Sequence, residues 1–521
     1  MPLTAGFHGI SQDKVAKLSS LKRLAGQTAV YGLSTILGRM LNYALVPFYT
    51  YIFDVPAVYG LNNEFYAYIS FLNIVFTYGM ETALFNFSST EPNRERVYTT
   101  ALRSVLVSTL FLALPLLVFA EPLAELMRYP DYAGFVWMAV GIVVTDALTA
   151  IPFAKLRLEG RPGRFAKLKL LNIGINLVIN FFFIGLCKWA YTKDPSSFFG
   201  SLYDPEIGIG YAFVANLVAN AVVLLLLLPE LRRIDIGFDP ELWRRMIRYA
   251  MPLLVVGLAG MVNETLDRIL LKYMLPEGTG ETAVGIYGAC YKISILMAIF
   301  RQAFQYAAEP FFFSQRNAGN ARDMYAKVMT IFVVACSLIF LGTTLNLSWI
   351  QYFIGPQFRA GLAVVPILLL ANLFLGIYFN LSIWYKLTGR TRSGMWITLA
   401  GAIITLTLNF IWIPSSSQWF GGYMGSAWAT LLCYGTMMVL SYYAGQKHFP
   451  VPYAVTRSIG YILLAIVLYV AGTFIDPDSQ WVSLLLRNAL LIPFVAVVWV
   501  LEKPRQWFAA KPVQPEKPLP S

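Results

Sequence analysis

The sequence predicts an all-α polytopic membrane protein with about fourteen transmembrane helices, and three observations support this. Of the 521 residues, 57% are hydrophobic and only 13% are charged, whereas soluble domains usually carry about 25% charged residues. Apolar runs of about 20 residues, the length that crosses a bilayer as a helix, recur along the whole chain. The basic residues gather in alternate connections between these runs, as they do in multi-pass membrane proteins.

The apolar runs follow one another with short connections. They cover approximately 25–53, 63–88, 97–120, 132–154, 165–189, 207–229, 249–273, 283–308, 325–347, 360–384, 393–413, 420–444, 454–474 and 481–501. The segment 1–24 contains four basic residues, and the run after it is too long for a signal peptide. The segment 502–521 is rich in proline and is expected to be a disordered tail.

The distribution of Lys and Arg predicts the orientation. If the N-terminus is cytoplasmic, 29 of the 40 basic residues lie in inside segments and six lie outside. The outside residues are Arg128, Lys188, Lys193, Lys272, Arg359 and Arg487. This asymmetry follows the positive-inside rule, and an even number of helices places both termini in the cytoplasm. The net charge of +12 is therefore explained by topology, and we expect no nucleic-acid partner.

Cofactor chemistry has little support in the sequence. The chain has two His and four Cys, and Cys187, Cys290, Cys336 and Cys433 lie in apolar runs without metal-ligand spacing. We interpret them as packing residues and expect no metal or cofactor. No Walker motif is present, so ATP hydrolysis is not expected and the chain is not expected to be an enzyme. The coupling ion, H⁺ or Na⁺, is left open.

Two pairs of similar segments indicate an internal repeat. RLEGR (157–161) resembles KLTGR (386–390) at an offset of 229, and AVYGLNNEFYAYIS (57–70) resembles AVGIYGACYKIS (283–294) at an offset near 226. We therefore predict an N-lobe of six helices (25–229), a cytoplasmic linker (230–248), a C-lobe of six helices (249–444) and two further helices (454–501). Because six is even, the halves are parallel repeats, an arrangement found in transporters with a substrate site between the halves.

The segment VNETLDRIL (262–270) places four polar residues inside the seventh run. At about 100° per residue, Asn263, Asp267, Glu264 and Arg268 point at about 0°, 40°, 100° and 140°, so they share one helix face. A charge near the bilayer centre costs at least about 2.5 kcal/mol, and this face is therefore expected to avoid lipid. Glu264 and Arg268 are expected to pair at i,i+4; a purely structural ion pair is the alternative to a functional site.

More charges lie in the helices that the repeat makes central. On helices 1, 2, 7 and 8 these are the cations Arg39, Arg268, Lys292 and Arg301 and the anions Glu81, Glu264 and Asp267. The excess of one cation predicts a net basic cavity. Asp267 and Lys292 lie at similar depth and are expected to face each other. Asp146, in the fourth run, is expected either to pair with a cavity cation or to carry a coupling proton.

Several segments resemble one known superfamily. LGRMLNYALVPFYTYIFDVPAVYG (37–60), YGMETALFNF (78–87), IPFAKLRLEGRPGRF (151–165) and VGIYGACYKIS (284–294) are similar to the multidrug/oligosaccharidyl-lipid/polysaccharide (MOP) exporter superfamily. Within it they most resemble the Wzx-type (O-antigen) flippases of bacterial polysaccharide synthesis. The resemblance implies MATE-like lobes around a central cavity lined by helices 1, 2, 7 and 8. It also implies flipping of an undecaprenyl-pyrophosphate-linked oligosaccharide to the outer leaflet of the cell inner membrane.

The expected site follows from the charges and this cargo. Arg39, Arg268, Lys292 and Arg301 are expected to bind the pyrophosphate, because cations, and Arg above all, pair well with phosphate oxygens. The acids expected to balance the cavity charge or couple an ion are Glu81, Asp146, Glu264 and Asp267. The expected partners are the lipid-linked oligosaccharide, membrane lipids, and the polymerase and glycosyltransferases of lipopolysaccharide or related polysaccharide synthesis.

Three other functions are left open by the sequence. A flippase for the peptidoglycan lipid precursor has the same pyrophosphate chemistry. A multidrug exporter of the same superfamily is disfavoured because cationic drugs require an acidic cavity. A membrane-embedded glycosyltransferase or ligase is disfavoured because the longest outside loop, 190–206, is too short for a catalytic domain.

Overall fold

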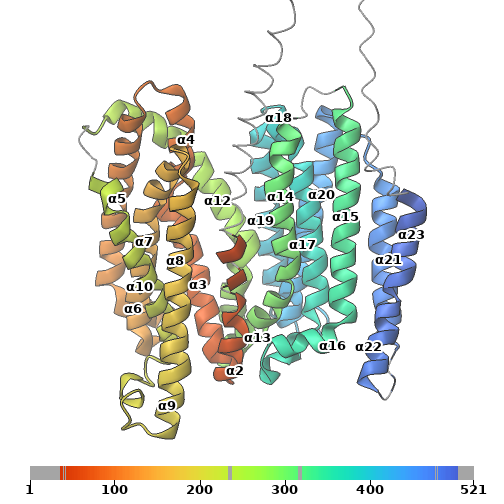
Figure 1. Ribbon diagram of the computed structural model, residues 1–521, viewed down its shortest axis with the longest axis horizontal. Coiled ribbons are helices and arrows are strands. Elements are labelled where there is room, and N and C mark those ends of the chain that lie inside the picture. The colour runs from red at the N-terminus through yellow and green to blue at the C-terminus, as the bar shows by residue number, and fades with distance from the viewer. Residues whose placement is uncertain are drawn as a thin grey trace, which may run out of the picture.

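The computed structural model describes residues 36–38, 40, 41, 43–232, 237–314, 319–475, 477 and 479–502. These residues form helices joined by loops, and no β-strand occurs among them (Figure 1). Ten helices are long and apolar enough to cross a membrane, or up to eleven if a bent helix pair counts as one span. The prediction of an all-α, multi-pass membrane protein is thereby confirmed.

The first half of the chain forms one bundle, which we call the N-lobe (Figure 1). Its helices are α2 (Leu45–Ile52), α3 (Pro56–Thr77), α4 (Met80–Thr90), α5 (Arg94–Val118), α6 (Ala120–Leu126), α7 (Ala133–Leu158), α8 (Pro162–Asn180), α9 (Lys188–Lys193), α10 (Tyr211–Leu226) and α11 (Leu228–Arg232). A π-helical segment, Phe181–Cys187, joins α8 to α9.

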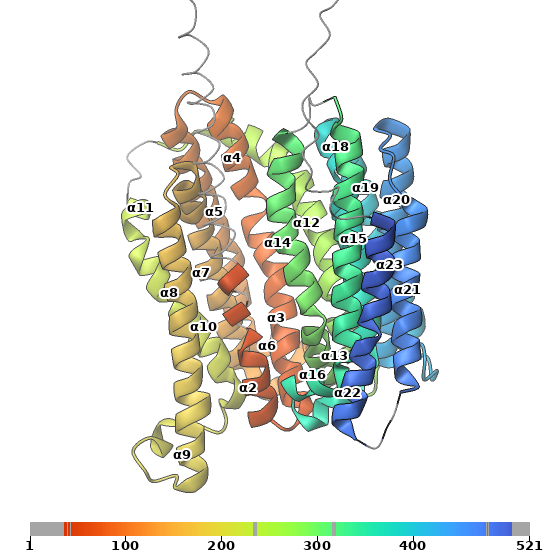
Figure 2. The same cartoon turned by 45° about the vertical axis from the view of Figure 1, so that its right-hand side comes forward.

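The second half forms the C-lobe and a peripheral helical pair (Figures 1 and 2). The C-lobe helices are α12 (Pro240–Met274), α13 (Thr279–Ile293), α14 (Ile295–Ser314), α15 (Ala321–Leu345), α16 (Leu347–Ile350), α17 (Val364–Leu381), α18 (Ile383–Leu387), α19 (Thr391–Trp412) and α20 (Gly422–His448). The pair consists of α21 (Val455–Thr473) and the consecutive helices α22 (Gln480–Ala489) and α23 (Leu491–Glu502), and α21 packs on α15.

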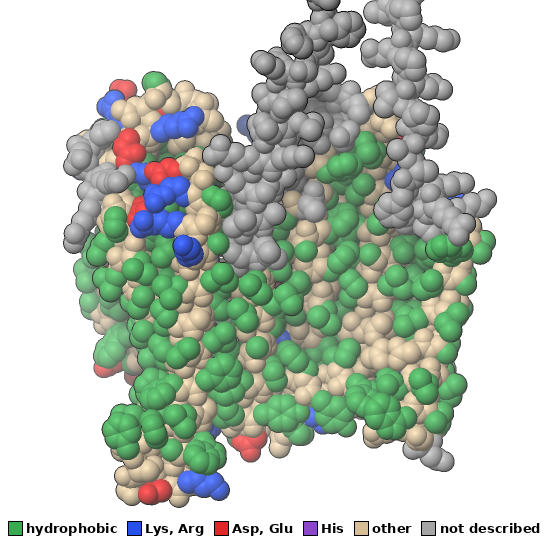
Figure 3. Space-filling view, in the orientation of Figure 1, with side chains coloured by type: hydrophobic (Ala, Val, Ile, Leu, Met, Phe, Trp, Pro, Cys, Tyr) green, Lys and Arg blue, Asp and Glu red, His purple; other side chains and the backbone are tan. Residues whose placement is uncertain are grey.

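Charged side chains distinguish the two ends of the bundle. Lys155, Arg157, Arg161 and Arg164 gather with acidic partners at the end where α4 ends and α8 begins, and apolar side chains cover the middle of the visible face (Figure 3). We call this end the basic end and the opposite end the far end.

Local sequence signals set several helix starts. The Asn93 side chain accepts a hydrogen bond from the backbone N–H of Arg96 and caps α5. Asp239 caps α12 in the same way, and Pro240 then occupies the first turn, where a missing N–H costs nothing. These signals start α12 at Pro240, inside the predicted linker, so this helix is longer than the predicted span 249–273.

Two of the predicted spans are broken. α3 ends at Tyr78 and Gly79, which both have positive φ (33° and 74°), and α4 continues in a new direction. Between α13 and α14 the axis bends by 49° at Ser294. Broken helices expose backbone and redirect side chains, and in membrane proteins they are tolerated where protein or a cavity surrounds them. Both breaks lie on helices that contribute to the site below.

Candidate functional site: a basic cavity between the lobes

A cavity of about 210 Å³ lies between the lobes. Its N-lobe wall comes from α3 and from Tyr43, and its C-lobe wall comes from α12, α13, α14, α17 and α20. These elements include helices 1, 2, 7 and 8 of the predicted order. Three basic residues, Arg268, Lys292 and Arg301, line the cavity together with one acid, Glu264. Among the described residues the cavity wall therefore has a formal excess of positive charge.

Arg268 is held by its own helix. Its guanidinium donates to the backbone carbonyl of Glu264 at 2.8 Å and to the carboxylate of Asp267 at 3.3 Å. The ring of Tyr291 lies 4.6 Å from the guanidinium carbon, within the range of a cation–π contact. Arg268 is 8% exposed. A buried guanidinium with these contacts has a fixed direction toward the cavity.

The four polar residues of VNETLDRIL do not all point in the same direction. Asn263 points into the C-lobe, where its side chain donates to the carbonyl of Thr398 and accepts from the hydroxyl of Thr405. The side chain of Glu264 is exposed, and it forms no ion pair with any described residue. The expected Glu264–Arg268 ion pair is thus wrong, because the guanidinium folds back on the Glu264 carbonyl and takes Asp267 as its acid.

Asp267 lies behind the cavity wall and does not face Lys292. Its carboxylate accepts from the backbone N–H of Arg268 at 2.9 Å and from the hydroxyl of Tyr287 at 2.6 Å. Lys292 is five residues after Tyr287 on α13, which rotates it by about 140° round the helix. The expected Asp267–Lys292 pair is therefore replaced by an Asp267–Arg268–Tyr287 cluster, and Lys292 lines the cavity beside Tyr43.

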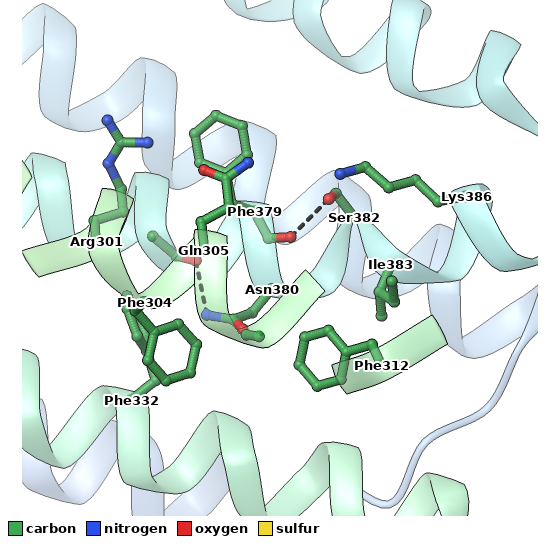
Figure 4. A pocket seen from close by; sticks show the side chains of 12 residues that line it. Arg301, Phe304, Gln305, Phe312, Phe332, Phe379, Asn380, Ser382, Ile383 and Lys386 are labelled. Atoms are coloured by element: carbon green, nitrogen blue, oxygen red, sulfur yellow. Dashed lines mark hydrogen bonds between the residues drawn. The ribbon is translucent and has the colours of Figure 1, made fainter. Parts of the chain in front are cut away.

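Arg301 lines both this cavity and a smaller pocket in the C-lobe. Its guanidinium carbon lies 4.9 Å from the centre of the Phe379 ring. Figure 4 shows Arg301 on α14 at one end of the smaller pocket and Lys386 at the other, with phenylalanine rings between them. Arg301 thus connects the basic cavity with an aromatic region of the C-lobe.

Neutral polar groups complete the cavity wall. They are Asn63, Tyr66, Ser70, Thr265, Gln302, Asn372 and Tyr434. Hydroxyl and amide groups both donate and accept hydrogen bonds, so this part of the wall suits a polyhydroxylated ligand. The sequence prediction missed these residues, because single neutral polar residues in apolar runs give no distinctive signal.

Two of the expected acids lie elsewhere. Glu81 forms an ion pair with Arg157 of α7 at the basic end, because the break at Tyr78 and Gly79 turns α4 toward that helix. Asp146 lies inside the N-lobe, where it accepts hydrogen bonds from Asn73 at 3.2 Å and Asn220 at 2.8 Å. Neither residue lines the cavity, which corrects the expected place of Glu81. Asp146 pairs with two amides and with no cavity cation among the described residues, and its role in carrying a coupling proton stays a prediction. Arg39 lies outside the described residues.

An interlobe ion pair that the sequence analysis did not identify lies between the cavity and the far end of the bundle. Lys272 of α12 lies 3.2 Å from the carboxylate of Glu64 of α3, and the two side chains are 0% and 1% exposed. Lys272 was counted among the outside basic residues because it lies at the end of the predicted span 249–273, and Glu64 was not singled out. Both residues lie inside predicted spans, and the cost of charges in such runs was the signal that could have found them.

Glycines allow close backbone contact beside this pair. A Cβ on Gly60 would lie 2.2 Å from the carbonyl oxygen of Glu281, and one on Gly285 would lie 1.9 Å from that of Pro56. Helices α3 and α13 therefore touch along their backbones. At the same end, the hydroxyl of Thr50 accepts from the backbone N–H of Gly355 at 3.1 Å.

The four cysteines lie in the packed interior of the protein. Cys187, Cys290, Cys336 and Cys433 are all buried and free. Among the described residues, no group of His, Cys, Asp and Glu is arranged to hold a metal ion.

Comparison with known structures shows the fold. The chain resembles a structure of the lipid II flippase MurJ in an inward closed conformation, with a TM-score of 0.68, 14% identity, and coverage of 90% of this chain and 98% of that one. An inward-facing multidrug resistance MATE family transporter of the MOP superfamily matches with a TM-score of 0.60, 13% identity, and coverage of 81% and 94%. A MATE protein in the straight conformation matches with a TM-score of 0.53 and 13% identity over 82% of this chain and 95% of that one.

No curated protein matches the sequence. The family model for polysaccharide biosynthesis proteins matches residues 24–315, which is more than half of the chain. This match assigns the chain to the polysaccharide biosynthesis protein family.

Proposed function

We propose that the protein flips an undecaprenyl-pyrophosphate-linked oligosaccharide, a polysaccharide repeat unit, from the inner to the outer leaflet of the cytoplasmic membrane by alternating access. The observation that carries this proposal is the cavity wall, in which the described residues include three cations, Arg268, Lys292 and Arg301, and one acid, Glu264. Pyrophosphate is a compact group with several negative charges. Guanidinium groups bind phosphate oxygens with two parallel, charge-assisted hydrogen bonds.

The glycan is expected to contact the neutral polar side chains of the cavity wall. The amides and hydroxyls of Asn63, Gln302, Asn372 and Tyr434 offer hydrogen bonds to sugar hydroxyls.

The basic end is the cytoplasmic end in this proposal, with both termini on that side and fourteen helices across the membrane. The far end then faces the outer side, where the Glu64–Lys272 pair joins the two lobes.

A peptidoglycan lipid precursor is the neighbouring cargo, because it has the same pyrophosphate. A multidrug cation is disfavoured, because it would add positive charge to a wall whose described residues include three cations and one acid. Coupling to H⁺ or Na⁺ and contact with the polymerase and glycosyltransferases belong to the same proposal.

Ligand competition in purified protein tests the cargo class. Undecaprenyl pyrophosphate is expected to bind at least tenfold more tightly than undecaprenyl monophosphate, because the second phosphate adds charge-assisted hydrogen bonds of about 1.5–3 kcal/mol. A lipophilic cation such as ethidium is expected not to compete. Equal affinity for the two lipids, or displacement of the pyrophosphate lipid by ethidium, would refute the proposal.

A further inference from the structure

A second cavity, of about 720 Å³, lies between α5 of the N-lobe and α12 of the C-lobe, near the basic end. Each of its two main walls is a row of residues spaced four apart, Arg103, Val107 and Phe111 on α5 and Trp243, Ile247 and Met251 on α12. Residues four apart are neighbours on one helix face. The cavity is therefore a groove that follows both helices for about 12 Å, and we call it the α5–α12 groove.

The α5–α12 groove opens on the surface of the bundle at membrane depth. The side chains of Val107 and Phe111 are 69% and 77% exposed. No charged residue occurs in α5 over 104–118 or in α12 over 249–263, so these stretches belong to the apolar part of a bilayer. The open side of the groove therefore meets lipid chains.

Arg103 stands at the edge of this apolar part. It is the last charged residue of α5, and the other charges of that helix lie in its first turn. Trp243 lies at the same level, because its indole N–H donates to the hydroxyl of Ser104 at 2.7 Å. Tryptophan and arginine at span ends are typical of the membrane–water interface, where lipid headgroups lie. The groove thus begins at headgroup depth and continues toward the hydrocarbon.

Arg103 is the one charged residue in the groove wall among the residues that the structure describes. Its guanidinium forms no ion pair or hydrogen bond with any of them. The neutral polar groups of the wall pair with one another: the hydroxyls of Tyr78 and Ser104 are 2.8 Å apart, and Ser108 donates to Tyr78 at 3.2 Å. The polar demand of the groove is therefore concentrated on one cation, and the anions present at headgroup depth are lipid phosphates.

We propose that the α5–α12 groove binds an anionic phospholipid of the leaflet at the basic end. The guanidinium of Arg103 holds two phosphate oxygens, a geometry that suits guanidinium well. One acyl chain lies in the apolar part of the groove, between Val107 and Ile247. Because the two walls belong to different lobes, the bound lipid joins the N-lobe to the C-lobe.

The surroundings of the groove favour a lipid with net negative charge. Arg244 and Arg248 directly follow Trp243 and Ile247 on α12, and neither has an acidic partner among the described residues. Each basic residue near the membrane surface adds to the attraction of anionic lipid. A zwitterionic lipid has the same phosphate but gains less from these two cations.

The groove is separate from the basic cavity that is proposed to hold the cargo. No residue lines both. Arg103 lies at the level of Trp243, which precedes Arg268 by 25 residues, or about 38 Å of helix. A cargo whose pyrophosphate lies on Arg268 therefore has no phosphate to place on Arg103. The occupant of the groove brings its own phosphate, as a membrane phospholipid does.

Native mass spectrometry of the purified full chain in detergent tests the proposal. The probe is phosphatidylglycerol, and phosphatidylcholine is the comparison lipid because it has the same phosphate and chains but no net charge. Phosphatidylglycerol is expected to bind at least about fivefold more tightly. The same spectra report any dimer of the chain.

Two variants address the two parts of the groove. Arg103→Ala is expected to lower the affinity for phosphatidylglycerol by about 10–100-fold, and Arg103→Lys by less. Val107→Trp fills the groove and leaves the cation in place, and at least a tenfold loss is expected because the acyl chain loses its place. Thermal unfolding shows that each variant is folded, and the Val107 variant keeps the test valid if Arg103→Ala does not fold.

The matched controls lie outside the groove. Arg245→Ala removes an exposed arginine at the same end, and Val118→Trp adds a tryptophan at a position of α5 that is 66% exposed. Both are expected to bind phosphatidylglycerol as the unsubstituted protein does.

Four outcomes would overturn the proposal. Two are equal affinity of the unsubstituted protein for both lipids, and affinity for phosphatidylglycerol that neither Arg103→Ala nor Val107→Trp lowers below the controls. The third is displacement of phosphatidylglycerol from Arg103 by undecaprenyl pyrophosphate, which would assign the groove to the cargo. The fourth is a dimer that Val107→Trp abolishes, which would assign it to a second copy of the chain.

Discussion

The carboxylate of Asp267 fixes the position of Arg268 in the cavity wall. The carboxylate accepts from the Arg268 backbone N–H at 2.9 Å and from its guanidinium at 3.3 Å, and Tyr287 donates to the other carboxylate oxygen. The acid is buried while the guanidinium lines the cavity. Asp267 is thus a positioning residue: it orients the cation that is proposed to meet the cargo, and it does not face the cargo itself.

Asp267→Ala is expected to destabilise the protein by about 3–5 kcal/mol, because it leaves the Arg268 charge and the Tyr287 hydroxyl without their buried acceptor. Asp267→Asn keeps the size and one acceptor oxygen, and about 1–3 kcal/mol is expected. Thermal unfolding in detergent measures both. Glu81→Gln is the control for loss of an acid at a partly exposed ion pair, with at most about 1 kcal/mol expected. An Asp267→Ala variant as stable as the Glu81→Gln variant would contradict this role.

Arg268→Ala and Arg301→Ala are each expected to lower the affinity for undecaprenyl pyrophosphate by about 10–100-fold, because each removes charge-assisted hydrogen bonds to phosphate. Lys at either position is expected to restore only part of the affinity, since an ammonium lacks the planar two-point contact of guanidinium. Cells with the alanine variants should show less surface polysaccharide at normal protein levels.

Arg245→Ala is the matched control for these arginines. Arg245 is an exposed arginine that pairs with Glu91 at the basic end, away from the cavity. The variant is expected to bind and transport as the unsubstituted protein does. If Arg268→Ala and Arg301→Ala bind undecaprenyl pyrophosphate as tightly as Arg245→Ala does, the cavity arginines contribute to helix packing and not to binding of the cargo.

The sequence predicted the helical architecture and three of the cavity cations because these depend on local properties. Apolar run length identifies spans, and the 100° rotation per residue placed Arg268 on a polar helix face. The partners could not be obtained in this way. Asp267 meets Tyr287 and Glu81 meets Arg157 because of how neighbouring helices rotate and break, and a single helix contains no information on its neighbours.

The far-end pair shows a second limit. Lys272 lies near the end of its apolar run, so the count of basic residues assigns it to the outside. In the structure α12 continues to Met274 and Lys272 is completely buried against the N-lobe. Charge counting assumes that basic residues near span ends face water. That assumption fails where an acid from another lobe, here Glu64, supplies the partner.

Cysteine labelling tests the orientation. Gly163→Cys, at the start of α8, is expected to react with an impermeant maleimide only from the cytoplasmic side, because α8 begins at the basic end. Ser416→Cys, between α19 and α20, is expected to react only from the outer side. Labelling of both positions from the same side would contradict the proposed topology.

Glycine substitution tests the close contact of α3 and α13. Gly285→Ala places a Cβ 1.9 Å from the carbonyl oxygen of Pro56, so α3 and α13 must separate. We expect a loss of about 1–3 kcal/mol in thermal stability, the usual cost of overpacking. Gly174→Ala on α8 is the control, because no atom lies within 4 Å of its Cβ. It is expected to be neutral or to stabilise by about 0.5–1 kcal/mol.

The double variant distinguishes a shared contact from two separate ones. Gly60→Ala places a Cβ 2.2 Å from the carbonyl oxygen of Glu281, on the same pair of helices. If one separation of α3 from α13 relieves both clashes, Gly60→Ala with Gly285→Ala is expected to cost at least about 0.5 kcal/mol less than the sum of the single variants. Strict additivity would mean that the two glycines act at independent contacts, and the far end would then not separate as one unit.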